Sequence, residues 1–454
     1  MKQWFYVFMM WSTTFFGGWA MASAEGPPFR QGELVVIDNI DLVPGNMIKR
    51  QHRNAGIVVL EVTPGAEQQE IARLKKMGIQ AHLNRIARKF VTTGDPFSSY
   101  QWHFDNVQAQ QAWTLSTGEG VTVAILDTGL NNGGPDGIHC VVSPASMLGN
   151  ASGAHDGDGH GTHVSGTVGQ STGNGVGVAG LAHGSCIMPV KVLNDEGSGT
   201  FSDIAAGIVY AVDQGAKVIN MSLGIDARFG ITRDPVMDPA LDYAYASGVT
   251  VVAAAGNDGF RKNVSYPAIY KTTLSVGATD YNNSLVRYSN QGTGLDLVAP
   301  GGNLSADGNG DGYADGVLQE TFDGNGFGYW FYQGTSMASP HVAATAALLI
   351  ANGTASHPDD IKSALTQTAL DLGESGPDKK YGFGLVQAYS ALLWVAGSPL
   401  PVPEGSCTDL DGDGVCFEEG DCDDNNAQVH PGMNEKGKRS RDGLDNDCNG
   451  IIDG

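Results

Sequence analysis

The chain has 454 residues, a formal net charge of −23 at pH 7 and 41% hydrophobic residues. This length exceeds one ordinary domain, and the hydrophobic content is sufficient for a large core. The acidic balance argues against nucleic acids and anionic membranes as partners and suits a protein that binds cations. The charge is also uneven, because residues 25–97 carry 10 basic and 8 acidic side chains whereas residues 98–454 carry 15 and 41.

The first 24 residues are typical of a secretory signal peptide. Lys2 supplies a positive start, residues 4–20 are apolar and aromatic, and Ala22-Ser23-Ala24 offers small residues for cleavage. An uncleaved membrane anchor is the alternative, although residues 12–14 interrupt the apolar run. We therefore expect a secreted protein without a transmembrane anchor, free or associated with a cell surface. The six cysteines fit this route, since disulfides persist outside the cytosol.

Residues 25–97 form the next segment and predict a small α+β unit. Strand-like runs occupy residues 33–37 and 56–61, and residues 67–77 place apolar side chains at helical spacing. The turn-prone residues 92–99 then indicate an exposed linker.

From about residue 98 to residue 397 the pattern changes to buried strands that alternate with helices. We expect strands at residues 121–126, 187–193, 218–221 and 249–254, and helices at residues 201–214 and 239–246. This alternation predicts an α/β domain, a parallel sheet covered by helices on both faces. Functional residues are expected where its strands end.

Residues 398–405 form a Pro-rich linker, and residues 406–454 form an Asp-rich module with 13 acidic and 4 basic side chains. The module has too few large apolar residues for an ordinary core. We expect disulfides and bound metal to hold it together.

Two stretches of the large domain carry candidate catalytic groups. An apolar strand ends at Asp127, where a carboxylate could orient a histidine, although turn or capping roles are common for such an Asp. Small residues around His160 would let a helix begin there and leave the imidazole available as a base. His160 and His163 could instead ligate a metal, as in a metal-dependent hydrolase.

The stretch GTSMASPHVA around Ser336 raises the question of what keeps this serine accessible. A tight turn would deliver Ser336 to a helix N-terminus, whose free N–H groups favour negative charge beside it. Pro340 is expected in the first helical turn, followed by a buried helix over residues 342–350. A plain N-cap serine is the alternative.

Together these stretches resemble the subtilisin-like serine proteases. The resemblance covers about residues 100–396 and rests on AILDTG, GHGTHVSGT, MSLG, AAAGN and GTSMASPHVA, with Asp, His and Ser in that order. An α/β-hydrolase is disfavoured because Ser336 lacks a G-x-S-x-G elbow. The resemblance implies a subtilisin-like three-layer fold, with Ser336 as nucleophile, His160 as base, Asp127 as its orienting partner and Asn257 in the oxyanion hole.

The resemblance also implies a substrate site and an inhibitor. Cleavage is expected after large apolar side chains, with some tolerance of basic ones. Residues 25–97 resemble the inhibitory propeptide of such proteases, and a permanent binding domain is the alternative. The enzyme is expected to act on proteins as a monomer. The implied pocket walls, rim and floor are Ser222, Leu223, Gly224, Ala254, Gly256, Asp258 and Ser265.

Four stretches alternate oxygen-bearing side chains with glycine, a pattern that wraps a hard cation such as Ca²⁺. None has the glutamate of an EF-hand at the twelfth position, and solvated turns are the alternative. Residues 406–454 resemble Asp-rich metal-binding modules appended to some bacterial secreted proteins. The candidate ligands are Asp307, Asn309, Asp311, Asp315, Asp409, Asp411, Asp413, Asp421, Asp423, Asp445, Asp447, Asn449 and Asp453.

The protease resemblance implies two further features. A calcium site near the start of the domain would use Asp136 and Asn174. Cys140 and Cys186 would lie on neighbouring strands and form a disulfide. For the tail, Cys407–Cys416 and Cys422–Cys448 are one hypothesis among the pairings that spacing allows.

The sequence therefore favours a secreted, calcium-stabilised serine endopeptidase made as a preproprotein. An inactive subtilase fold that serves as a calcium-binding surface or adhesion protein is the second hypothesis. The presence of Asp127, His160, Asn257 and Ser336 favours the enzyme.

Overall fold

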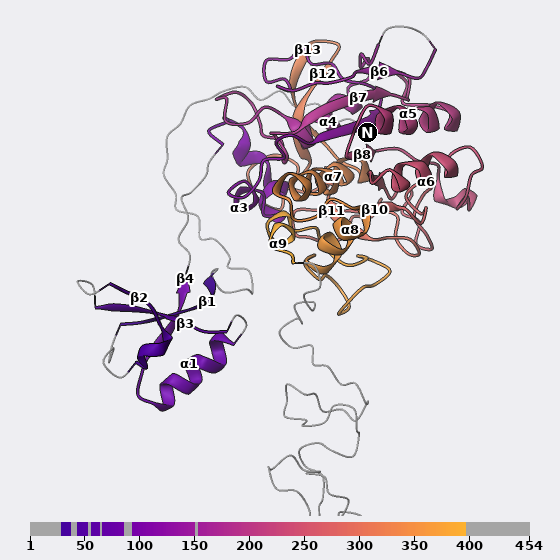
Figure 1. Ribbon diagram of the computed structural model, residues 1–454. Coiled ribbons are helices and arrows are strands. Elements are labelled where there is room, and N and C mark those ends of the chain that lie inside the picture. Colours follow the sequence, from indigo (N-terminus) through magenta and orange to yellow (C-terminus); the bar gives the residue numbers. More distant parts are fainter. Residues whose placement is uncertain are drawn as a thin grey trace, which may run out of the picture. The chain divides into compact units, whose positions relative to one another are not determined.

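The computed structural model describes residues 29–37, 43–52, 56–63, 66–85, 93–149 and 153–395 (Figure 1). These residues form two compact units, one within residues 29–85 and the other within residues 93–395. The expected signal peptide, Pro-rich linker and Asp-rich module, with four cysteines and nine candidate ligands, lie outside the described residues. Within the described ranges, no helix combines the length and apolarity needed to cross a bilayer.

The smaller unit is a four-stranded antiparallel sheet with one helix, as the α+β prediction requires. The strand order is β2-β3-β1-β4. The core contains Leu34 of β1, Leu60 of β3 and Leu74 of α1, all fully buried. The elements are β1 (Phe29–Val36), β2 (Ile48–His52), β3 (Ile57–Glu61), α1 (Glu67–Lys76) and β4 (Ala81–Arg85), with a 3₁₀ turn at Gly45–Met47.

The larger unit is built on a seven-stranded parallel sheet in the order β11-β10-β9-β8-β5-β7-β6. The predicted strands are observed within one or two residues. The strands are β5 (Thr122–Asp127), β6 (Ala145–Ser146), β7 (Cys186–Lys191), β8 (Val218–Met221), β9 (Thr250–Ala254), β10 (Thr273–Thr279) and β11 (Leu297–Pro300).

Helices cover both faces of this sheet because its strands are apolar on both sides. Along β5, Val123 and Ile125 pack with α4 and α7 in one core, whereas Ala124 and Leu126 pack with α5 and α6 in a second core (Figure 1). The result is the predicted three-layer α/β architecture. The helices are α2 (Trp102–Asn106), α3 (Ala109–Ala112), α4 (His160–Gly169), α5 (Phe201–Asp213), α6 (Asp238–Ala246), α7 (Thr335–Asn352), α8 (Pro358–Gln367) and α9 (Ala388–Leu392), with 3₁₀ turns at Ser98–Tyr100 and Ala227–Phe229.

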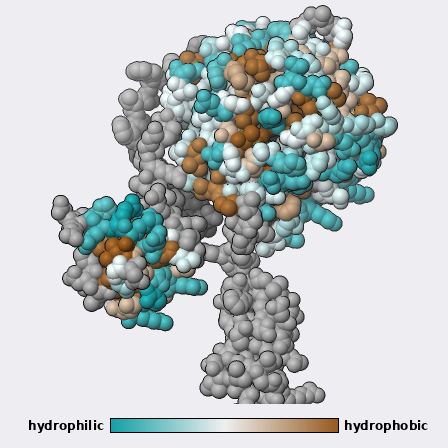
Figure 2. All heavy atoms as spheres, viewed as in Figure 1, coloured by the Kyte–Doolittle hydropathy of each residue, from teal (hydrophilic) through white to brown (hydrophobic). Residues whose placement is uncertain are grey.

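The surface of the larger unit is mixed in polarity. Hydrophilic residues dominate the face shown in Figure 2, and hydrophobic residues gather there in separate patches. Such patches are normal for a folded domain, because polar atoms alone cannot cover its surface.

Two expectations about local structure need correction. Residues 93–99 are exposed at Gly94, Pro96 and Ser99, but Asp95 is buried and accepts the backbone N–H groups of residues 173–175, so the segment is packed against the rest of the larger unit. The helix after Ser336 begins at Thr335, so Pro340 lies inside α7 and not in its first turn.

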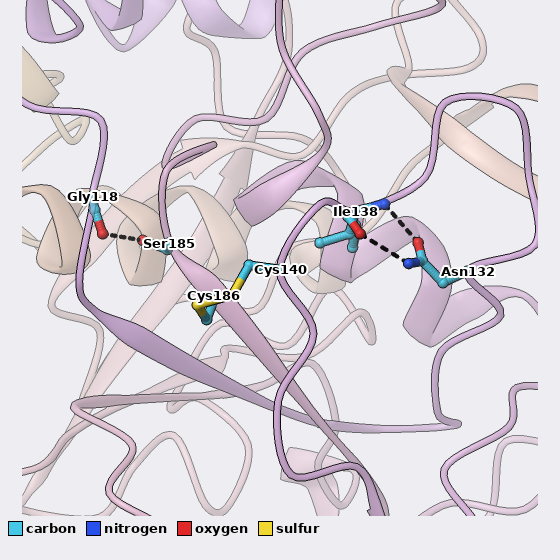
Figure 3. Close-up of a disulfide and its surroundings, with 6 residues drawn as sticks. All are labelled: Gly118, Asn132, Ile138, Cys140, Ser185 and Cys186. Atoms are coloured by element: carbon cyan, nitrogen blue, oxygen red, sulfur yellow. Dashed lines mark hydrogen bonds between the residues drawn. A yellow bond between two sulfur atoms is a disulfide. The ribbon is translucent and has the colours of Figure 1, made fainter. Parts of the chain in front are cut away.

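The expected disulfide between Cys140 and Cys186 is present (Figure 3). Cys186 opens β7, but Cys140 lies just before an isolated bridge between Val141 and Ile187, not in a strand. Asn132 Nδ2 donates to the Ile138 carbonyl and Asn132 Oδ1 accepts the Ile138 N–H, and these two bonds brace the segment before Cys140 (Figure 3).

Candidate active site

Asp127 ends β5, the strand between β7 and β8. Its carboxylate is fully buried, and Oδ1 accepts the Thr128 backbone N–H at 2.7 Å. The same oxygen lies 2.7 Å from His160 Nδ1. The structure thus brings together two side chains that are 33 residues apart.

His160 is the first residue of α4, and glycines on both sides allow this placement. Gly159 has φ 98°, a conformation that favours glycine. A Cβ at Gly161 would lie 2.3 Å from the Gly129 carbonyl oxygen, so only glycine fits there. The His160 side chain remains 27% exposed.

The electrostatic surroundings of His160 favour its protonated form. Burial lowers the pKa of His160, but the charge and hydrogen bond of Asp127 outweigh this, with support from Asp158 and Asp156, and the net pKa is raised. An imidazole of this kind can take up a proton and hold it beside a carboxylate.

Ser336 is the second residue of α7, and the preceding turn depends on Gly334. This glycine has φ 152° and ψ 161°, a region adopted almost only by glycine. Ser336 Oγ donates to the Ser222 carbonyl oxygen at 3.2 Å. In the described part of the chain, the Ser336 hydroxyl therefore bonds to Ser222 and not to His160.

Pro340 shapes the same turn from inside the helix. A residue at position 340 would normally donate its N–H to the Ser336 carbonyl, and proline cannot. That carbonyl instead accepts the Ser222 hydroxyl at 2.8 Å. Pro340 is therefore tolerated because Ser222 satisfies the acceptor that it leaves free.

Asn257 faces the same turn. Its Oδ1 accepts both the backbone N–H and the hydroxyl of Thr335, each at 2.9 Å, which orients the amide. A Cβ at Gly334 would lie 3.5 Å from Asn257 Nδ2 and 3.6 Å from Ser336 N, so two N–H donors flank this glycine. Thr335 is a positioning residue that sequence reasoning missed.

His163 does not take part in this arrangement. It is fully buried in α4, its Nε2 lies 3.1 Å from the carbonyl oxygens of Val317 and Trp330, and its ring stacks on Tyr332. Burial lowers its pKa to about 3. These contacts give no support to the alternative of a His160–His163 metal centre.

The candidate pocket walls lie close together. A Cβ at Gly256 would lie 2.3 Å from Ser265 Oγ, and a Cβ at Gly224 would lie 2.9 Å from the Tyr266 carbonyl oxygen. Ala254 ends β9, where it is buried. Leu223 is half-buried and packs against the second core.

Asn290 holds the pocket residues in place and was missed by the sequence analysis. Its Nδ2 donates to the Ala255 carbonyl at 3.0 Å and to Ser265 Oγ at 3.2 Å, while its Oδ1 accepts the N–H of Asp258. The Asp258 carboxylate lies 3.5 Å from Arg228 Nη2. The only sequence signal for Asn290 is an Asn-Gln-Gly turn, which is common in loops.

The candidate calcium ligands Asp136 and Asn174 contact each other. Asp136 is buried, accepting Asn174 Nδ2 at 2.9 Å and the Val178 N–H at 2.8 Å. Burial raises the pKa of Asp136 to about 6, and the charges of Glu320 and Asp95 add to the effect.

These acidic groups suit a hard cation. Within the described chain, no Lys or Arg forms an ion pair with Asp95, Asp136 or Glu320. A Cβ at Gly177 would lie 2.2 Å from Asp136 Oδ2, so the loop wraps closely around this carboxylate. No three His, Cys, Asp or Glu side chains of the described residues converge on one point to hold a metal. A bound Ca²⁺ would therefore need backbone carbonyl and amide oxygens as additional ligands.

The parallel sheet, the Asp127–His160 pair and a serine at a helix N-terminus are the arrangement expected of a serine hydrolase. Comparison with known proteins is consistent with this class. Residues 118–384 match the model of the subtilase family, and residues 421–454 match one described as "Putative metal-binding motif". The chain belongs to the subtilase family and is a serine endopeptidase with a subtilisin-like fold.

Relatives of known name are similar over the same region. Thermitase of Thermoactinomyces vulgaris is 38% identical over 304 residues, which cover 67% of this chain and 100% of the relative. Subtilisin Savinase of Lederbergia lenta is 39% identical, with 64% of this chain and 98% of the relative covered. The solved structure of proteases from Pseudoalteromonas arctica PAMC 21717 is 34% identical, with a TM-score of 0.60, over 67% of this chain and 99% of that chain.

Proposed function

We propose that Asp127, His160 and Ser336 hydrolyse peptide bonds through an acyl-enzyme. Ser336 Oγ attacks the scissile carbonyl while His160 takes its proton, and the C–N bond breaks as His160 returns the proton to the leaving amine. Water, activated by the same imidazole, then releases the acyl group. Asp127 keeps His160 in the tautomer with Nδ1–H and stabilises its charged form.

The observation that carries this proposal is the 2.7 Å contact between Asp127 Oδ1 and His160 Nδ1 at the end of the sheet. Ser336 Oγ donates to the Ser222 carbonyl in this structure, so the proposed mechanism requires it to exchange this bond for one to the other imidazole nitrogen. Catalytic hydrogen bonds are often loose without substrate, so the resting rotamer agrees with this role.

Asn257 Nδ2 and the backbone N–H of Ser336 form the proposed oxyanion hole. Both lie beside Gly334, whose missing side chain leaves room for an oxygen. Removing the Asn257 amide is expected to lower kcat about 10²–10³-fold, the magnitude known for the equivalent donor in subtilisin.

A labelling experiment tests the proposal. The purified protein, with residues 25–97 removed, is incubated with casein and with a fluorophosphonate. We expect casein cleavage and a single adduct at Ser336, both lost in Ser336→Ala and both kept in Ser202→Ala, a control at an exposed serine of α5. Intact casein and an unlabelled Ser336 in correctly folded protein would instead favour an inactive subtilase fold used for surface binding.

The proposed specificity is broad, with a preference for large apolar side chains before the cleaved bond. A Cβ at Gly224 or Gly256 would meet Tyr266 or Ser265, so these glycines let the two candidate walls pack directly against the residues behind them. Arg228 lies beside Asp258, so the rim carries little net attraction for basic substrates. Peptide substrates that differ only at this position, with Phe, Lys or Gly, test the preference through kcat/KM.

Residues 1–24 and 25–97 are proposed to direct export and to inhibit the enzyme until they are removed. The support is the signal-like sequence, the separate α+β unit, and the small positive net charge of residues 25–97 against the strongly negative charge of residues 98–454. Casein activity before and after removal of residues 25–97 tests the inhibitor role, and equal activities would refute it.

Calcium is the proposed metal at Asp136 and Asn174, with Asp95 as an added ligand candidate, and in the segment 406–454. A bound Ca²⁺ would neutralise the buried acidic groups near Asp136. The metal content of the purified chain, measured by mass spectrometry, tests both the identity and the number of ions.

A further inference from the structure

The loop between β11 and β12 (Val317–Asp323) is closed at its neck by backbone hydrogen bonds. Asn303 N donates to the Asp315 carbonyl at 2.7 Å, and Asp315 N donates to the Ala306 carbonyl at 2.8 Å. The enclosed segment, residues 307–315, places oxygen-bearing side chains at Asp307, Asn309, Asp311 and Asp315. None of its three carboxylates forms an ion pair with a Lys or Arg of the described chain.

Asp315 differs from the other ligand candidates of this segment, because it is buried and only 2% exposed. Its Oδ2 accepts the Gly308 N–H at 2.6 Å, so the carboxyl group points into the loop. Its Oδ1 is buried and has no hydrogen-bond partner among the described residues. A buried acceptor without a partner destabilises the fold, and more so when it is charged.

We propose that residues 307–315 bind a hard divalent cation, Ca²⁺, with Asp315 Oδ1 as the inward ligand. Asp307, Asn309 and Asp311 supply further oxygens from the exposed side. Ca²⁺ suits the loop better than Mg²⁺, because it accepts irregular sets of six to eight oxygens. The inference does not depend on the catalytic roles proposed above.

The resting loop is not a finished metal centre, because no three acidic, His or Cys side chains of the described residues converge there. Asp307 accepts the N–H groups of Gly310, Asp311 and Gly312, and Asp311 accepts that of Tyr313. Cation binding must exchange some of these bonds for ligand bonds. We therefore expect a moderate affinity and a loop that becomes more ordered on binding.

The base of the loop is connected to the candidate nucleophile. Gly334 N, two residues before Ser336, donates to the Gly301 carbonyl at 2.9 Å. After the loop, the Val317 carbonyl contacts His163 of α4 at 3.1 Å. These contacts join the base of the loop to the turn before Ser336 and to α4, the helix that begins at His160.

Calcium binding to the full-length Ser336→Ala chain, which cannot digest itself, tests the proposal by equilibrium dialysis. Asp315→Asn is expected to bind one Ca²⁺ fewer per chain than the parent. Asp323→Asn is the matched control, because it makes the same change in the Asp-Gly-Asn-Gly turn of the hairpin formed by β12 and β13 (Gly326–Tyr332), and it should bind the parental number.

Terbium emission distinguishes this loop from the Asp-rich segment. Tyr313 lies in the loop and can sensitise bound Tb³⁺, whereas residues 406–454 contain no Tyr or Trp. Asp315→Asn and Tyr313→Phe should each remove the same component of the emission.

Two results would overturn the proposal. One is a folded Asp315→Asn chain, checked by circular dichroism, that binds as many ions as the parent. The other applies if Asp315→Asn does not fold, and uses the exposed Asp311→Asn. A Ca²⁺ affinity at least tenfold weaker in Asp311→Asn supports the site, whereas the parental number of bound ions at the parental affinity refutes it.

Discussion

Acid is expected to unfold the larger unit through three buried histidines, His103, His163 and His341. All three are fully buried. His341 Nδ1 donates to the Met337 carbonyl at 2.9 Å, so its Nε2 must accept from His103 Nδ1 at 2.8 Å. A second proton on His341, at Nε2, would point at the N–H of His103 Nδ1, and two donors would face each other. For His163 the ring nitrogen Nδ1 has no partner among the described residues.

The magnitude follows from the pKa values. Burial lowers the pKa of His163 to about 3 and that of His341 to about 4, and it lowers the pKa of His103 well below the usual 6.5. The unfolded chain therefore binds more protons than the folded chain between these values and 6.5, so stability falls as the pH falls through this range. At pH 4 the loss is about 3 kcal/mol each for His163 and His341, at about 1.4 kcal/mol per pH unit. Their sum is comparable with the whole stability of a typical domain, about 5–15 kcal/mol.

Urea unfolding of the Ser336→Ala chain at pH 7, 5.5 and 4 measures this effect. Carboxylates also respond to acid, so the informative comparison is with His163→Gln, in which the loss between pH 7 and pH 4 should shrink by about 3 kcal/mol. The exposed His357, changed to Asn, keeps a capping side chain at α8 and should behave as the parent. Equal pH 7 to pH 4 losses in parent and His163→Gln would refute the reasoning.

Three further predictions concern the site and the scaffold. Thr335→Val should lower kcat about tenfold with little change in KM, because the Asn257 amide loses one of the two bonds that orient it. Gly256→Ala should raise KM for peptide substrates with large apolar side chains. Its Cβ would lie 2.3 Å from Ser265 Oγ, so the two candidate pocket walls would have to shift. Replacing both Cys140 and Cys186 by Ala should lower the free energy of unfolding by about 4 kcal/mol in urea titrations, since the bond closes a loop of 46 residues.

The sheet and its helices could be predicted because their residues repeat simple patterns. β8 was expected at residues 218–221 and is observed there, since Val218, Ile219 and Met221 make an apolar run shortly after a helix. The strands of this sheet are apolar on both faces, so a continuous apolar run marks each strand. Such patterns are local and need no knowledge of distant contacts.

The parts of the site that sequence missed depend on distant partners. Asp95 looked like a linker residue, and only its contacts with residues 173–175 show it as buried. Asn290 has the sequence context of an ordinary turn, yet it holds Asp258 and Ser265. In each case the local sequence is typical of a loop, and the three-dimensional neighbours decide the role.

Pro340 illustrates the same limit at the nucleophile itself. Local rules for proline predict a helix start close before residue 340, and this placed Pro340 in the first turn. The helix continues through it because Ser222, 114 residues earlier in the chain, donates to the carbonyl that proline leaves free. Ser222 in turn accepts the Ser336 hydroxyl through its own carbonyl. The candidate pocket wall and the candidate nucleophile are thus joined by two reciprocal hydrogen bonds, so a change at Ser222 should alter the geometry of Ser336 as well as the shape of the pocket.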